Sequence, residues 1–154
     1  MKRKLLAMDV DGTLTDGRIY MGPNGEVMKA FDVKDGYGIV HLREYGIEPV
    51  IITGRESDIV RRRAEELHIT ELYQGVTDKL AKLREVAEKF GAAPDEIAYI
   101  GDDLNDLACI RFAGITAAPA DAMEQVKKEV DHVCRQNGGH GAVREFLDLI
   151  TGEE

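Results

Sequence analysis

Cysteine, histidine and tryptophan are scarce in this sequence, and their scarcity excludes several kinds of protein. The 154 residues include two cysteines, four histidines and no tryptophan. Cys109 and Cys134 are too few for a disulfide framework and lack the spacing of metal ligands, so we expect two reduced, packed thiols. Without clusters of histidine and cysteine, a zinc site is not expected.

Long apolar runs and an excess of basic residues are also missing. No run approaches the roughly 18 apolar residues of a membrane span, and residues 1–9 reach an acid before a signal-peptide core forms. We therefore expect a cytoplasmic protein. The net charge of −9 and the pI near 5.0 argue against nucleic acid or an anionic membrane as a partner.

Apolar strands alternate with amphipathic helices along the chain. The pattern predicts strands at 4–10, 48–53, 72–76, 97–100, 115–118 and 130–133. It predicts helices at 35–45, 57–67, 78–90, 107–112, 123–129 and 142–150. Such alternation is typical of an α/β fold with a doubly wound, Rossmann-like parallel sheet. We expect residues 1–154 to form a single domain of this kind.

A β-hairpin is expected between the first strand and the first helix. Two β-prone arms, within residues 18–31, flank the dipeptide Asn24-Gly25. This dipeptide accepts the positive φ angles of a tight turn. The hairpin, about residues 17–32, should project from the sheet.

Polar side chains follow the predicted strands, at the edge where parallel α/β sheets bind ligands. They are Asp9, Asp11 and Thr13 after the first strand, Thr53, Gly54 and Arg55 after the second, Lys79 after the third, and Asp102, Asp103 and Asp106 after the fourth. Crowded carboxylates repel one another unless a cation lies among them, and oxygen ligands favour Mg²⁺. With a lysine and a hydroxyl beside the magnesium, we expect a phosphoryl group as the ligand.

Asp9 and Asp11 are spaced so that their side chains start on the same side of an extended chain. One carboxylate can attack phosphorus to form an aspartyl-phosphate, while the other protonates the leaving alcohol and then activates water. Gly12 lets the chain bend over the phosphate, and Gly54 allows close backbone approach. The pattern therefore predicts a magnesium-dependent phosphatase.

Four segments, in order, resemble the motifs of the haloacid dehalogenase superfamily of phosphatases. They are Asp9–Thr15, Ile52–Gly54, Lys79 and Gly101–Asp106. The resemblance implies a haloacid dehalogenase-like fold with Asp9 as nucleophile and Asp11 as general acid and base. It implies Thr53 and Lys79 as phosphate-binding residues. It also implies magnesium held by the Asp9 side chain, the Asp11 backbone carbonyl and Asp102.

Over almost its whole length the chain resembles the capless phosphatases of the 3-deoxy-D-manno-octulosonate 8-phosphate type. The resemblance is carried by the hairpin, Phe31–Ile39, Tyr73–Gly75, Gly101–Asp106 and Gly138–Glu145. It implies hydrolysis of a phosphorylated sugar acid, a step toward the lipopolysaccharide core. It also implies a homotetramer, in which the hairpin and the tail, about residues 136–154, close the site of a neighbouring subunit.

Several residues have alternative interpretations. Arg55 suits a substrate carboxylate, because its planar fork matches one. Arg63 is a candidate substrate contact or part of a solvated helix face, and Arg144 either reaches a neighbour's site or complements a helix. Asp103 either orients Lys79 or caps a helix, and Asp106 is expected to support the site.

Three other functions stay open. Relatives that act on nonulosonate 9-phosphates share helices like Arg61–Glu65, but tend to have an acid where this chain has Arg55. A phospho-accepting signalling receiver gathers similar residues, but in a different order along the chain. A non-catalytic oligomerisation module is disfavoured because the catalytic motif residues are intact.

Overall fold

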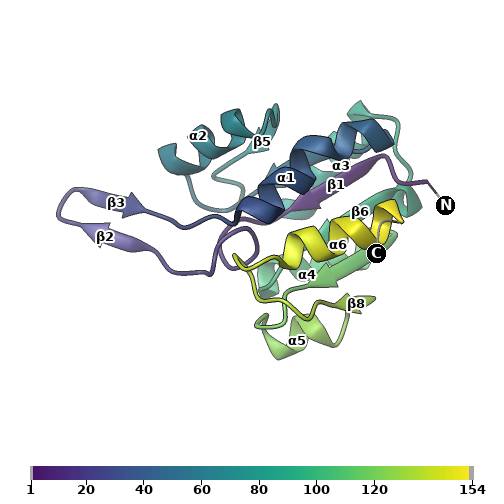
Figure 1. Ribbon diagram of the computed structural model, residues 1–154. Coiled ribbons are helices and arrows are strands. Elements are labelled where there is room, and N and C mark those ends of the chain that lie inside the picture. Colours follow the sequence, from purple (N-terminus) through teal and green to yellow (C-terminus); the bar gives the residue numbers. More distant parts are fainter. Residues whose placement is uncertain (1, 153–154) are drawn as a thin grey trace.

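A six-stranded parallel sheet forms the centre of the computed structural model, which describes residues 2–152 (Figure 1). The strands are β1 (Leu5–Met8), β4 (Glu48–Ile52), β5 (Glu71–Tyr73), β6 (Ile97–Ile100), β7 (Ile115–Ala118) and β8 (His132–Val133). Their order is β5-β4-β1-β6-β7-β8, and neighbouring strands are parallel. Along the chain, β4 and β5 are added on one side of β1, and β6, β7 and β8 are then added on its other side. The topological switch point therefore lies beside β1.

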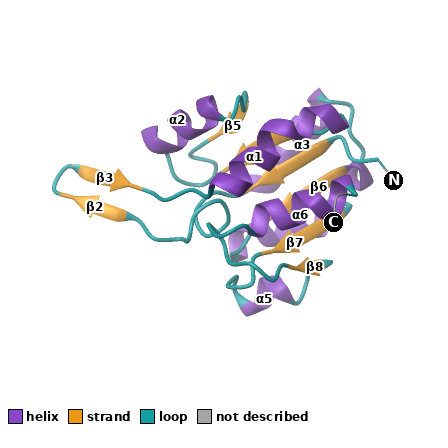
Figure 2. Ribbon diagram, viewed as in Figure 1, coloured by secondary structure: helices purple, strands orange, loops and turns teal. Residues whose placement is uncertain are grey.

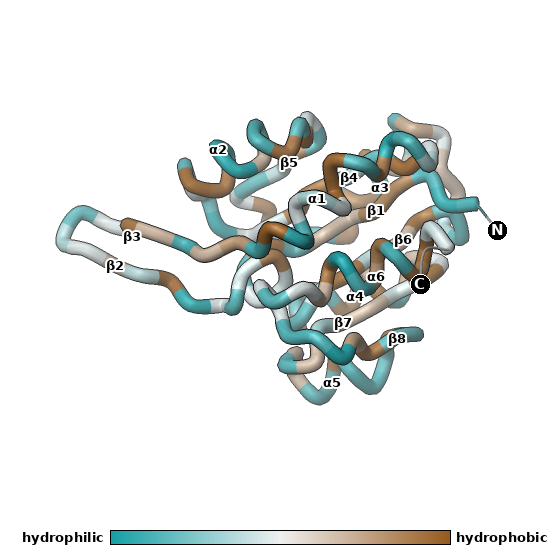
Figure 3. The backbone as a smooth tube through the Cα atoms, in the orientation of Figure 1, coloured by the Kyte–Doolittle hydropathy of each residue, from teal (hydrophilic) through white to brown (hydrophobic). Residues whose placement is uncertain are grey.

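Helices cover both faces of the sheet, as predicted for a doubly wound fold (Figure 2). They are α1 (Val33–His41), α2 (Asp58–Glu66), α3 (Lys79–Lys89), α4 (Leu107–Phe112), α5 (Glu124–Lys127) and α6 (Ala142–Thr151), with 3₁₀ turns η1 (Leu42–Tyr45), η2 (Pro94–Glu96) and η3 (Leu104–Asp106). Leu6 and Met8 of β1 pack with α1, α2 and α6, while Leu5 and Ala7 pack with α3 and α4. Successive side chains of a strand point to opposite faces, so β1 is apolar throughout (Figure 3).

Side-chain caps fix where the helices begin. The predicted N-cap at Ser57 is confirmed, because its Oγ accepts a hydrogen bond from the Val60 amide. Asp78 caps α3 in the same way, through the Ala81 amide at 3.0 Å. Asp32 accepts from two amides and starts α1 at Val33, ahead of the predicted start at residue 35.

The predicted hairpin is confirmed, but its turn lies one residue earlier than expected. Strand β2 (Tyr20–Gly22) pairs antiparallel with β3 (Gly25–Met28), and Gly22 lies opposite Gly25. Pro23 and Asn24 therefore form the turn, and proline holds φ negative at its first position. A turn centred on Asn24-Gly25 needs positive φ at both residues, whereas only Gly25 adopts one here, +117°.

The hairpin projects beyond the ends of the strands, while the tail folds back on the body (Figure 1). The Gly139 amide donates to the Thr13 carbonyl at 3.2 Å, and α6 packs beside α1. This part of the predicted tail, 136–154, therefore contacts the first-motif loop of its own chain. Residues 153–154 lie outside the described residues. Within residues 2–152, no helix has the length and hydropathy needed to cross a membrane.

Candidate active site

Three carboxylates meet at the ends of β1 and β6, which are neighbours in the sheet. Oxygen atoms of Asp9, Asp102 and Asp106 all lie within 4.8 Å of one another. The loop after β1 passes so close that a Cβ atom on Gly12 would lie 1.9 Å from Asp102 Oδ2. Gly12 also has a φ of +90°, so this position suits glycine alone. The strand-end residues predicted to converge are thus brought together.

Lys79, the first residue of α3, lies among these carboxylates. Its side chain is buried, and its Nζ donates to Asp9 Oδ1 and to Asp106 Oδ1, each at 2.9 Å. Burial alone would lower the pKa of Lys79, but Asp9 and Asp106 raise it above its ordinary value. The ammonium therefore stays charged beside the Asp9 carboxylate, as a phosphate-binding lysine requires.

Asp106 holds this lysine in place and is itself held by three donors. The Tyr99 hydroxyl donates to Asp106 Oδ1 at 2.5 Å, and the amides of Asp102 and Asp103 donate to Oδ2 at 3.0 and 3.2 Å. The side chain of Asp103 accepts a hydrogen bond from the Leu104 amide at 2.7 Å. Of the two interpretations of Asp103, this contact is the helix cap. Orienting Lys79 thus falls to Asp106.

Tyr99 was not predicted as a site residue, although the sequence holds a signal for it. It is the one side chain with a hydroxyl in the apolar run Ile97–Ile100, and it is completely buried. A buried tyrosine hydroxyl needs a hydrogen-bond partner. Acids follow the strand closely in the sequence, and one of them, Asp106, is the partner.

The carboxylates outnumber the positive charge inside this cluster. Burial and the charge of Asp106 raise the pKa of Asp9, although Lys79 works against them. Burial and the hydrogen bond with Asp9 raise the pKa of Asp102 to about 9. Without a further cation, Asp102 therefore keeps a proton at neutral pH. The all-oxygen donor set and the missing positive charge fit a hard divalent cation such as Mg²⁺.

Asp11 lies at the mouth of the site, where residues of the hairpin reach it. Lys29 Nζ contacts Asp11 Oδ1, and Arg55 Nε lies 3.9 Å from Asp11 Oδ2. Glu26 Oε2 accepts a hydrogen bond from Arg55 at 3.3 Å. Sequence reasoning missed Lys29 and Glu26, because no pattern in the sequence connects the hairpin with a residue so much earlier in the chain.

Thr53 and Gly54 follow β4, the strand next to β1 on its other side. Thr53 is buried, and its amide donates to the Tyr73 carbonyl at 3.0 Å while its carbonyl accepts from the Val76 amide at 3.1 Å. These bonds fix the backbone of Thr53 at the same sheet edge as Asp9. The role of Thr53 as a phosphate-binding residue stays a prediction.

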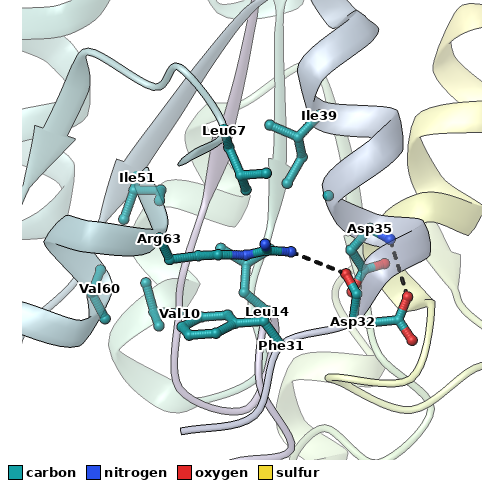
Figure 4. A pocket seen from close by; sticks show the side chains of 11 residues that line it. Val10, Leu14, Phe31, Asp32, Asp35, Ile39, Ile51, Val60, Arg63 and Leu67 are labelled. Atoms are coloured by element: carbon teal, nitrogen blue, oxygen red, sulfur yellow. Dashed lines mark hydrogen bonds between the residues drawn. The ribbon is translucent and has the colours of Figure 1, made fainter. Parts of the chain in front are cut away.

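Arg63 and Arg144 lie around α1, away from the carboxylate cluster. Arg63 stacks over the Phe31 ring at 5.4 Å and donates to the Asp32 carbonyl at 3.3 Å (Figure 4). Arg144 lies over the Tyr37 ring at 5.3 Å, and its Nε donates to Asp148 at 2.9 Å. Their roles as substrate contacts stay predictions.

Asp35 is a buried acid that the sequence placed at the start of a helix and in the segment Phe31–Ile39, with no role of its own. It lies in α1 beside Arg63 (Figure 4), and its Oδ1 accepts from the Arg144 amide at 2.9 Å. Within residues 2–152 its Oδ2 is buried without a hydrogen-bond partner. Burial raises the pKa of Asp35 to about 7. Asp35 therefore links α1 to the start of α6, and burying its carboxyl group costs solvation free energy.

Comparison with known proteins places the chain in a family. The model of the haloacid dehalogenase-like hydrolases matches residues 67–147. The 3-deoxy-D-manno-octulosonate 8-phosphate phosphatase of Escherichia coli is 48% identical over 147 residues, which are 96% of this chain and 78% of the relative. The enzyme of the same name from Salmonella typhi is 47% identical over the same shares.

Solved structures agree with this match over nearly the full chain. The 3-deoxy-D-manno-octulosonate 8-phosphate phosphatase of Yersinia pestis has a TM-score of 0.95 at 46% identity, covering 98% of this chain and 82% of that one. The phosphatase of Moraxella catarrhalis, solved with magnesium ion, phosphate ion and KDO, has a TM-score of 0.94 at 45% identity, covering 99% and 87%. This chain belongs to the haloacid dehalogenase-like hydrolases, within the family of 3-deoxy-D-manno-octulosonate 8-phosphate phosphatases.

Proposed function

We propose that this protein is a magnesium-dependent phosphatase that hydrolyses 3-deoxy-D-manno-octulosonate 8-phosphate to the free sugar acid and phosphate. The observation that carries the proposal is the buried group of Asp9, Lys79, Asp102 and Asp106, with Asp11 at its mouth. It occurs in a chain that matches phosphatases of that substrate over 96% of its length.

The proposed reaction has two steps. An oxygen of Asp9 attacks phosphorus, and the bond from phosphorus to the sugar oxygen breaks as Asp11 gives that oxygen a proton. Asp11 then takes a proton from water as the water oxygen attacks the aspartyl-phosphate, which releases phosphate and restores Asp9. Lys79 and Thr53 bind phosphoryl oxygens. Magnesium, held by Asp9, Asp102 and the Asp11 carbonyl, would neutralise charge on the phosphoryl group.

Arg55 is the residue we propose for the carboxylate of the sugar acid. Its side chain is 47% exposed beside Asp11, so a ligand at the mouth can reach it. Glu26 holds the guanidinium through Nη2, and a guanidinium has further donors in a planar fork that suits a carboxylate. A nonulosonate 9-phosphate carries a carboxylate too, and it is the alternative substrate.

A homotetramer belongs to the proposal. The hairpin extends away from the body (Figure 3). Four of its apolar residues are 39–63% exposed: Tyr20, Met21, Val27 and Met28. Exposed apolar side chains on a projecting arm suit burial against another subunit. Light scattering tests the assembly, and a monomer at micromolar concentration would contradict it.

A cytoplasmic location also belongs to the proposal, because both cysteines are free thiols, as in a reducing compartment.

The decisive assay compares phosphate release from three classes of substrate in the presence of magnesium. They are the octulosonate 8-phosphate, a nonulosonate 9-phosphate and simple hexose phosphates. A preference for the octulosonate of about 100-fold in kcat/KM corresponds to about 2.7 kcal/mol of discrimination in the transition state. We expect that preference or a larger one, and equal rates on all three classes would overturn the substrate assignment.

The Asp9→Asn variant tests the chemistry apart from the substrate. We expect it to lose at least about 10⁴-fold in kcat, because no other group at the site replaces the nucleophile. The fold should persist, since a neutral side chain relieves the repulsion between Asp9 and Asp106. Near-normal turnover in this variant would contradict the covalent mechanism, whatever the substrate.

A further inference from the structure

Lys29, which follows β3 of the hairpin, is an amine buried between two carboxylates. Its side chain has an exposure of 0%, and its Nζ contacts Asp11 Oδ1 and lies 3.3 Å from Glu26 Oε2. Lysine is seldom fully buried unless it is paired. Lys29 is therefore held by specific partners, and one of them is the residue that handles the proton in the proposed reaction.

Glu26 anchors this lysine to the body of the protein. Its Oε1 accepts from the Ser57 hydroxyl, and its Oε2 accepts from Arg55 Nη2 at 3.3 Å. Ser57 is the N-cap of α2, so the hairpin is fastened to the start of a helix. Partial burial would raise the pKa of Glu26, but Ser57 and Lys29 hold it below its ordinary value. The carboxylate thus stays charged and keeps Lys29 beside Asp11.

The two oxygens of Asp11 have different surroundings. Lys29 contacts Oδ1, whereas Oδ2 lies 3.9 Å from Arg55 Nε, whose side chain is largely exposed at the mouth. A carboxyl group with one oxygen held cannot turn freely. The oxygen on the open side is then the one available to a leaving group.

We propose that Lys29 is a positioning residue for the reaction: it fixes Asp11 Oδ1 so that Asp11 Oδ2 delivers the proton to the leaving oxygen. This inference rests on the proposed function. The proton passes from Asp11 to the sugar oxygen as the bond from that oxygen to phosphorus breaks. Lys29 touches neither the phosphorus nor the leaving oxygen, and it acts only through Asp11.

The test compares two leaving groups in the Lys29→Met variant, which keeps an unbranched side chain and removes its charge. An alkyl phosphate such as a sugar phosphate needs its leaving oxygen protonated, whereas p-nitrophenyl phosphate does not. General-acid catalysis contributes about 10²- to 10⁴-fold. Because kcat/KM reports only the steps up to the aspartyl-phosphate, we expect kcat/KM on the sugar phosphate to fall by about 10²-fold, with kcat/KM on p-nitrophenyl phosphate little changed. Equal losses on both substrates would overturn the proposal.

Matched variants separate positioning from general damage. Asp11→Asn sets the largest selective loss that the site can show, and Lys128→Met, the same change at an exposed lysine, should alter neither rate. Glu26→Gln weakens the anchor of Lys29 and should give a smaller loss with the same selectivity. Lys29→Arg keeps the charge and should restore part of the rate on the sugar phosphate.

The same experiment distinguishes failure of this inference from failure of the proposed function. If Lys29→Met does not fold, the selective loss expected of Glu26→Gln decides the matter, and its absence counts against the proposal. A wild-type protein that is active on both substrates, with no selective loss in either variant, would refute only the role of Lys29. A wild-type protein that releases no phosphate in magnesium would refute the proposed function, and the role of Lys29 with it.

Discussion

Two clusters of charged side chains flank the loop after β1, and the fold holds them in different ways. The central cluster, Asp9, Lys79, Asp102 and Asp106, comes from strand ends and the first residue of α3, and it is mostly buried. The hairpin cluster, Asp11, Glu26, Lys29 and Arg55, is assembled from the hairpin and the loops after β1 and β4. Arg55 is its exposed member, whereas the side chain of Lys29 is fully buried.

The balance of charge differs between the two clusters. The central cluster sets one ammonium against three carboxylates, and it responds by raising the pKa of Asp9 and that of Asp102. The hairpin cluster sets two cations against two carboxylates, and the pKa of Glu26 is lowered. The first cluster therefore calls for a further cation, as a divalent metal ion would supply. The second is complete as it stands, which suits it to orienting groups rather than to binding a metal.

Removing the single cation of the central cluster should have the largest effect on stability. Lys79→Met leaves Asp9 and Asp106 buried without their partner, and breaking such a buried pair costs about 3–5 kcal/mol. Urea denaturation of the metal-free protein measures the loss. The double variant Lys79→Met with Asp106→Asn should recover much of the stability and none of the activity. A loss below about 1 kcal/mol would show that this pair behaves like a surface pair.

Asp35 lies outside both clusters and tests what burial alone does to a carboxyl group. Its pKa is raised to about 7, while the unfolded chain keeps the ordinary value of 3.8. As pH rises from about 4 to 7, the unfolded state loses this proton and the folded state keeps it, so stability falls. A shift of about three units corresponds to at most about 4 kcal/mol.

The Asp35→Asn variant isolates this contribution. The free energy of unfolding of the wild type should fall relative to that of the variant between pH 4 and pH 8, and the difference should level off above pH 8. Denaturation at several pH values measures it. Asp58→Asn, the same change at an exposed acid, is the matched control for the substitution itself. A difference that is constant with pH would mean that Asp35 ionises as it does in the unfolded chain.

Magnesium should stabilise the central cluster by satisfying its excess of carboxylates. At a concentration about 100 times its Kd, a ligand that binds only the folded state adds about 2.7 kcal/mol. We expect EDTA to abolish phosphate release, magnesium to restore it, and the melting temperature to rise with magnesium in the wild type. The rise should be much smaller in Asp102→Asn. An equal rise in both proteins would place the ion elsewhere.

The exposed pair of the hairpin cluster should have the smallest effect on stability. Arg55 and Glu26 are 3.3 Å apart, and the Arg55 side chain is 47% exposed. Pairs of this kind contribute about 0.2–1 kcal/mol. Arg55→Ala should therefore leave stability nearly unchanged while it raises KM for the sugar acid phosphate. A large loss of stability would show that the hairpin cluster is needed for folding.

The same contrast explains what the sequence could reveal. The central cluster could be predicted because local patterns specify it. An apolar run indicates a strand, and the acid that follows it lies at the carboxyl end of the strand, where ligands bind in such sheets. Strands at 97–100 and 115–118 and the helix at 107–112 were predicted with the bounds observed. The hairpin cluster depends on how a projecting arm packs against α2. Lys29 reads as a surface lysine in the sequence, but in the fold it is buried and paired with Asp11 and Glu26, and Glu26 is held by Ser57.

The most direct test of the account looks for phosphate on Asp9 during turnover. The protein is mixed with 3-deoxy-D-manno-octulosonate 8-phosphate and magnesium, quenched in acid within one turnover, and treated with borohydride, which reduces an aspartyl-phosphate to homoserine. Peptide mass spectrometry then locates the change. The account predicts homoserine at position 9 in the wild type and none in Asp9→Asn. Rapid phosphate release with position 9 unmodified, or with the modification at another residue, would contradict it.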